Sequence, residues 1–116
     1  MSIFGFLKIG SDKETKEKTL FKSFFLSVDN IRKKDGKLKR GECEIEFFDN
    51  TFQIRQGSEI IEYNIDSIYY FDIWEFKDNT YFKFRMRSLN EIKFCSQHFE
   101  WMYISKLLKK RGITVK

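Results

Sequence analysis

The chain has 116 residues, a formal net charge of +5 at pH 7, two cysteines and no proline. That length suits one domain, and its 14 phenylalanines, 5 tyrosines and 2 tryptophans can fill a core that needs no disulfide staples. Two cysteines without CxxC spacing exclude a disulfide framework, so we expect free thiols and a cytoplasmic location.

Residues 1–18 are predicted to form an apolar and basic extension, followed by one domain over residues 19–116. The apolar stretch that holds Phe4, Phe6 and Leu7 is too short for a signal peptide or a membrane-spanning helix. Because lysines follow it, this stretch suits contact with a membrane interface or a partner. It equally suits covering an open end of the same molecule, and both interpretations stay open.

Residues 19–29 fit two different structures. Four of their apolar residues alternate as in a strand: Leu20, Phe24, Leu26 and Val28. The apolar spacing also suits a helix of about twenty residues, with a capping box formed by Ser11 and Glu14. Periodicity favours the helix, whereas the architecture of the remaining chain favours the strand.

The next part of the chain alternates between apolar and polar residues, with turn residues between short runs, which is typical of half-buried strands. The predicted strands cover residues 42–48, 51–56, 59–63, 69–76, 81–87 and 91–95. In the first of them, glutamates alternate with apolar residues, so we expect Glu42, Glu44 and Glu46 to be solvated on an open face. A small corner over residues 65–68 separates the third and fourth strands.

Residues 96–111 change to the period of a helix. Trp101, Ile104 and Leu108 form its apolar stripe. Three further side chains are expected to widen that apolar face: Phe99, Met102 and Tyr103. Gly112 is a suitable C-cap, so the helix should end near Arg111.

This order of elements resembles the pleckstrin-homology-like (PH-like) superfold, particularly the small bacterial PH-like and GRAM-like domains. The resemblance spans residues 41–111 and rests on four features: Gly41-Glu42 opening a strand, the corner Ile65-Asp66-Ser67-Ile68, the hairpin into residues 91–95, and Trp101 in the closing helix. It implies an α+β, mainly antiparallel fold, a small barrel of six to seven strands closed by a C-terminal α-helix. The upstream pattern also admits an extra N-terminal helix. The family implies a binding or scaffolding module for membrane lipids, peptides or partner proteins, without catalysis.

Charge divides the chain into three regions. Residues 1–40 carry 11 Lys and Arg against 5 Asp and Glu, residues 41–80 carry 2 against 10, and residues 81–116 carry 9 against 2. An acidic group of strands thus lies between two basic segments. The densest basic run consists of Arg32, Lys33, Lys34, Lys37, Lys39 and Arg40.

If residues 19–29 form the first strand, this basic run becomes the loop between the first two strands. The resemblance places phosphoinositide contacts of PH domains in that loop, although the family's lysine, then basic-x-arginine signature is not met here. Each Lys or Arg near an anionic lipid surface contributes about 1 kcal/mol, so six cations matter at low salt. The alternative, which we favour, is a solvated loop without a partner.

A second basic stripe consists of Lys83, Arg85 and Arg87, which share one face of their predicted strand with Tyr81. Such a stripe suits phosphate or acidic peptide, and the ring suits base stacking. We favour pairing of these cations with acidic residues on neighbouring strands, because such pairing offsets their mutual repulsion.

Catalytic chemistry has little support in the sequence. His98 is the single histidine, Cys95 has no identifiable base, and the chain has no glycine-rich phosphate loop. We therefore expect no catalytic, metal or cofactor residues, no small-molecule substrate and no enzyme activity. The chain is predicted to be a non-enzymatic binding or assembly module for a protein partner or a second copy. The alternative is peripheral binding to an anionic membrane, at its inner face, through residues 32–40, and nucleic-acid binding ranks third.

Overall fold

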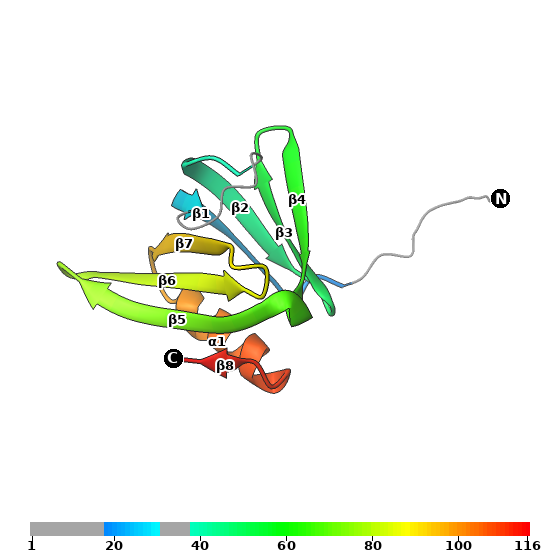
Figure 1. Ribbon diagram of the computed structural model, residues 1–116. Helices are drawn as coiled ribbons and strands as arrows, with labels where there is room; N and C mark the ends of the chain where they lie inside the picture. The colour runs from blue at the N-terminus through cyan, green and yellow to red at the C-terminus, as the bar shows by residue number, and fades with distance from the viewer. Residues whose placement is uncertain (1–17, 31–37) are drawn as a thin grey trace.

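The computed structural model describes residues 18–30 and 38–116, which form one sheet and one helix (Figure 1). The strands are β1 (Phe21–Asn30), β2 (Gly41–Phe47), β3 (Thr51–Gln56), β4 (Glu59–Asn64), β5 (Ile68–Phe76), β6 (Asn79–Met86), β7 (Glu91–Ser96) and β8 (Thr114–Val115). A short 3-10 helix, η1 (Ile65–Ser67), joins β4 to β5, and α1 (Glu100–Lys110) follows β7.

The strands lie in the order β4-β3-β2-β1-β7-β6-β5-β8, and all neighbours are antiparallel except β5 and β8. The first half of β1 pairs with β2 and its last residues pair with β7, with a shift in register between Phe25 and Val28. Strand β1 therefore joins a group formed by β2, β3 and β4 to a group formed by β5, β6 and β7.

Aromatic side chains from both groups fill a single core. Seven phenylalanines are fully buried: Phe25, Phe47, Phe52, Phe71, Phe82, Phe84 and Phe94. The ring of Phe84 lies 6.1 Å from that of Phe47 on β2 and 5.2 Å from that of Phe71 on β5. Helix α1 adds Ile104 and Leu108, both completely buried, to this core.

The predicted fold class is confirmed in its coarse form: an α+β chain with a β-dominated core and one C-terminal helix. Residues 21–30 form a strand, so the helical alternative is wrong for this part of the chain. The capping box at Ser11 and the apolar stretch before it lie outside the described residues. Closure of the sheet into a barrel stays a prediction, because β4 and β8 stand at opposite ends of the described strand order.

Helix α1 begins at Glu100, four residues later than the expected start at residue 96. The reason is that Ser96 still belongs to β7 and that the Glu100 carboxylate binds the segment between the two elements. The short strand β8 was not predicted, because Thr114 and Val115 carry no alternation that marks a strand.

Candidate functional site

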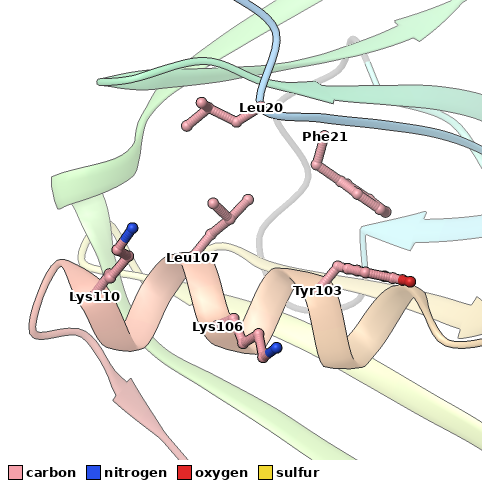
Figure 2. Close-up of a pocket in the computed structure, with 6 residues that line it drawn as sticks. All are labelled: Leu20, Phe21, Tyr103, Lys106, Leu107 and Lys110. Atoms are coloured by element: carbon pink, nitrogen blue, oxygen red, sulfur yellow. The ribbon is translucent and has the colours of Figure 1, made fainter.

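A groove runs between α1 and the start of β1. Its central hollow has a volume of about 360 Å³ and is lined by Leu20, Phe21, Tyr103, Lys106, Leu107 and Lys110. Figure 2 shows Leu107 rising from α1 toward Leu20 and Phe21, with Lys110 at one end of the hollow. The rings of Phe21 and Tyr103 stack with centroids 5.8 Å apart, so β1 and α1 both form its walls.

Two smaller hollows extend this space along α1. One, of about 300 Å³, lies beside Phe99 and Met102 and shares Tyr103 and Lys106 with the central hollow. The other, of about 240 Å³, shares Leu20, Leu107 and Lys110. We call the three hollows together the α1 groove.

The α1 groove exposes apolar side chains that sequence analysis assigned to the widened apolar face of α1. Ile104 and Leu108 are buried as expected, but Phe99 is 64% exposed, Tyr103 58% and Met102 44%. These three side chains stay exposed because the sheet covers only a narrow stripe of the helix, which holds Ile104 and Leu108. Within residues 18–30 and 38–116, this apolar surface stays exposed, as surfaces that bind a ligand do.

The rim of the α1 groove is basic. Lys106 and Lys110 are exposed beside the central hollow. Among the described residues that line the three hollows, the sole acid is Asp49, at the end of the groove. Arg111 lies beside it, donates a hydrogen bond to the Asp49 carbonyl oxygen, and pairs with Asp66 at 3.1 Å.

The predicted basic loop does lie between the first two strands, since β1 ends at Asn30 and β2 begins at Gly41. Four of its cations lie outside the described residues: Arg32, Lys33, Lys34 and Lys37. Lys39 and Arg40 are exposed, and Arg40 pairs with Asp29 at 3.0 Å. The main chain of Lys39 exchanges two hydrogen bonds with the Gln56 side chain, which fixes this end of the loop against β3. The candidate contacts Phe4, Phe6 and Leu7 also fall outside the described chain.

Two members of the second basic stripe pair within the sheet, as expected. The Glu91 carboxylate lies 3.3 Å from Lys83 Nζ and 2.9 Å from Arg85 Nη1. Their partner therefore comes from β7 rather than from the acidic middle of the chain. Arg87 Nε instead donates a hydrogen bond of 3.2 Å to the Asp66 carbonyl oxygen.

Glu46 contradicts the prediction that the glutamates of β2 are solvated. Its side chain is buried, accepts hydrogen bonds from Thr19 and Arg55, and forms an ion pair with Arg55. Burial alone would raise the pKa of Glu46, but the hydrogen bonds from Thr19 and Arg55 outweigh it, so the pKa is lowered. The misjudgement arises because period-two alternation does not show which outer-face residues a neighbouring arginine covers.

Aromatic side chains gather on the outer face of β5 and β6. The residues of β5 that alternate with buried Phe71 share this face, and three of them are aromatic: Tyr70, Trp74 and Phe76. Trp74 is the register partner of Tyr81, and the two rings stack with centroids 5.8 Å apart. Phe76, near the end of the hairpin, is 57% exposed. Figure 1 shows this hairpin extending beyond the neighbouring strands.

Each of these rings has a cation beside it. The nitrogen-to-centroid distances are 6.0 Å for Lys83 and Trp74, 5.5 Å for Lys93 and Tyr81, 5.3 Å for Lys77 and Phe76, and 3.9 Å for Lys116 and Tyr70. Since cation–π contacts occur roughly once per 70–80 residues, this is a local concentration. We call these rings and their cations the aromatic–basic face. The sequence pattern singles out Lys83 and Tyr81 but not Trp74 and Lys93, because only the register of three strands brings these residues together.

Residues with catalytic potential are isolated from one another. Cys43 is buried, and desolvation, followed by the nearby charge of Glu44, raises its pKa to about 12, so its thiol stays protonated at neutral pH. His98 is exposed, and its backbone N–H donates to Glu100. Within residues 18–30 and 38–116, no cluster of His, Cys, Asp and Glu is suited to holding a metal ion. No helix in the same described part is long and apolar enough to cross a membrane.

Comparison with known proteins gives no match to any family model or to any curated protein. We therefore infer the function from three surfaces of the structure: the α1 groove, the basic loop and the aromatic–basic face.

Proposed function

We propose that this chain is a non-enzymatic binding module of PH-like architecture, and that its α1 groove binds an acidic amphipathic segment of a partner protein. Seven antiparallel strands followed by a helix that packs on their core support the architectural part of the proposal. The barrel inferred from the sequence would then close at the corner formed by η1.

The observation that carries the functional part is the uncovered apolar surface of α1. Phe99, Met102 and Tyr103 stay exposed along a helix whose opposite side is buried in the core. A small protein with enough apolar residues to bury has no folding reason to leave these three uncovered together, and such patches mark interaction sites. Alongside them, Leu20 and Leu107 provide the apolar wall of a groove, the surface to which amphipathic segments dock.

The positive charge of the rim favours a partner segment that carries acidic residues. Lys106 and Lys110 flank the apolar surface, and the lone acid among the described lining residues, Asp49, lies at its end next to Arg111. Complementary potentials speed association and exclude wrong partners. A segment with apolar residues on one side and Asp or Glu on its flanks fits this surface.

Site-specific photo-crosslinking in cells that express the protein tests the proposal. Benzoylphenylalanine in place of Tyr103 should give a discrete protein adduct whose cross-linked peptide is acidic and apolar. The double variant Lys106→Glu with Lys110→Glu should abolish this adduct, because it reverses the charge of the rim. A matched double reversal away from the groove, Lys39→Glu with Lys77→Glu, should leave the adduct unchanged.

The control position for the photo-crosslinker is Phe76, an exposed aromatic residue on the opposite side of β5. The same adduct from Phe76 would mean that capture is unspecific and would refute the groove as the binding site. A lipid adduct alone, or an adduct that survives reversal of both groove lysines, would also refute the proposal.

A second candidate is binding to anionic membranes through residues 32–40. The exposed side chains of Lys39 and Arg40, at the fixed end of that connection, favour it. Vesicles of phosphatidylglycerol and phosphatidylcholine should then sediment with the protein at low salt. Changing Arg32, Lys33 and Lys34 to Ala should abolish sedimentation. No sedimentation of the unaltered chain would rule this candidate out.

A further inference from the structure

Strand β6 and its neighbours present a second surface, separate from the α1 groove. Helix α1 packs on the core side of the sheet, through Ile104 and Leu108. Trp74, Tyr81 and Lys93 belong to the opposite side of the same strands and are half-buried there. From this surface we propose that the aromatic–basic face binds single-stranded nucleic acid.

The spacing of the positions that carry the rings suits bases. Trp74 and Phe76 are two residues apart on one face of a regular strand, which separates their Cα atoms by about 6.4–6.8 Å. A planar base stacked between two rings needs about twice the 3.4 Å repeat of stacked bases, which is the same distance. Phe76 is exposed, so a base has access to this gap from the end of the hairpin.

The arrangement of charges points to an anionic ligand. Lys83 on β6 is directly opposite Lys93 on β7, and like charges in opposing positions destabilise a sheet. Glu91 offsets part of this charge, since it pairs with Lys83 and Arg85. On the other side of β7, Lys93 is opposite Asp29, whose carboxylate is bonded to Arg40.

An excess of positive charge therefore remains over these strands. Five cations lie on or beside the face, Lys77, Lys83, Arg85, Lys93 and Lys116, against the three carboxylates of Asp29, Asp72 and Glu91. Beyond β7, the charge of Arg40 is paired with Asp29. A phosphate backbone that follows Lys83 and Lys93 would relieve their repulsion while the bases reach the rings.

Single strands fit this face better than duplexes do. Aromatic side chains stack on bases only when the base faces are free, and in a duplex the neighbouring bases occupy them. Stacking on Trp74 and Phe76 also favours no particular base, since every base has a π face. We therefore expect binding with weak sequence preference and strong salt dependence.

Fluorescence titration of the full chain tests this inference. The variant Trp101→Phe leaves Trp74 as the sole tryptophan, so its emission reports on the face directly. Oligothymidylate and oligouridylate of twelve nucleotides should quench this emission at low salt. With about three phosphates neutralised, the logarithm of the binding constant should fall with the logarithm of salt with a slope of about −2.

Two variants on this background, each with a matched control, localise the site. Lys93→Ala should reduce the salt slope by about 0.7, whereas Lys106→Ala, in the α1 groove, should leave it unchanged. Phe76→Ala should weaken binding by roughly 5-fold to 150-fold, the effect of losing one stacking partner. Phe99→Ala removes an equally exposed phenylalanine from the α1 groove and should change nothing.

Several outcomes would overturn the inference. One is the absence of quenching by either oligonucleotide at low salt. Another is equal affinity for a duplex of the same length, which would indicate unspecific polyanion binding. Unchanged affinity in both the Lys93→Ala and the Phe76→Ala variant would also overturn the inference. None of these results tests the α1 groove. The proposed protein-binding function is therefore tested independently, by the photo-crosslinking experiment.

Discussion

At the residue scale, Glu100 connects β7 to α1. Its carboxylate accepts hydrogen bonds from Ser96 Oγ at 2.7 Å, from the Gln97 backbone at 3.1 Å and from the His98 backbone at 2.8 Å. Burial would raise the pKa of Glu100, but these hydrogen bonds outweigh it and lower the pKa. The side chain thus satisfies donors in the segment that leads from β7 into the helix.

Replacing Glu100 with Ala should therefore destabilise the protein. We expect a loss of about 2–3 kcal/mol in the free energy of unfolding, because one buried and two part-buried donors lose a charged acceptor. Urea unfolding at neutral pH, followed by far-UV circular dichroism, measures this. Glu75→Ala, at an exposed position of β5, is the control and should change stability by less than about 0.5 kcal/mol. Equal effects of the two substitutions would contradict the role assigned to Glu100.

Glu46 makes the free energy of unfolding depend on pH in the acidic range. Its pKa is lowered below the ordinary value of 4.5 in the folded state, so its contribution is fully present above that pH and disappears as the pH falls through the folded value. Glu46→Gln should lower stability at neutral pH and make the decline below pH 4.5 shallower. Unfolding free energies measured at about pH 7 and at lower pH would reveal this. An unchanged acid decline in Glu46→Gln would show that other carboxylates cause it.

At the scale of elements, the two-residue strand β8 covers part of the edge of β5. Its two residues pair in parallel with β5, and the backbone N–H of Lys116 donates to the Phe71 carbonyl oxygen at 2.7 Å. Ile113 and Val115 also pack, partly buried, against the core. This short segment therefore covers part of an edge that would otherwise present unpaired backbone groups.

Deletion of residues 113–116 should expose that edge of β5. We expect a loss of about 1–3 kcal/mol in stability, because apolar contacts of Ile113 and Val115 disappear. We also expect association that increases with concentration, measured by light scattering. The substitution Val115→Ser separates the two effects, since it reduces burial but keeps the backbone pairing. A deleted chain that stays in the same oligomeric state as the full chain would refute the edge-covering role.

Elements with strong periodicity could be predicted from the sequence, whereas features that depend on distant partners could not. The strand over Thr51–Gln56 was predicted with the observed bounds, because apolar residues alternate between clear turns. The start of α1 could not be predicted, because Glu100 accepts hydrogen bonds from the Ser96 side chain at the end of β7 and from the main chain of Gln97 and His98. In the candidate site, single cations such as Lys83 were identified. Their combination with Trp74 and Lys93 depends on strand register, which no local pattern encodes.

At the scale of the whole molecule, the two proposed binding surfaces are formed by different elements. The α1 groove lies between α1 and the start of β1, and the aromatic–basic face lies on the outer side of β5, β6 and β7. The core between them is continuous, because Phe84 contacts rings from both groups of strands. A ligand on one surface therefore does not block the other sterically.

The continuous core also predicts how the protein unfolds. Trp74 on β5 and Trp101 on α1 report on different parts of the chain, and the variants Trp101→Phe and Trp74→Phe isolate each signal. Because Phe84 touches Phe47, Phe52 and Phe71, we expect one cooperative transition with the same urea midpoint for both probes. On either background, Phe84→Ala should lower the unfolding free energy by about 3–5 kcal/mol. If this substitution shifted the midpoint of one tryptophan and not the other, α1 and the group formed by β5, β6 and β7 would be separate folding units. The shared phenylalanine core would then fail to couple α1 to the aromatic–basic face.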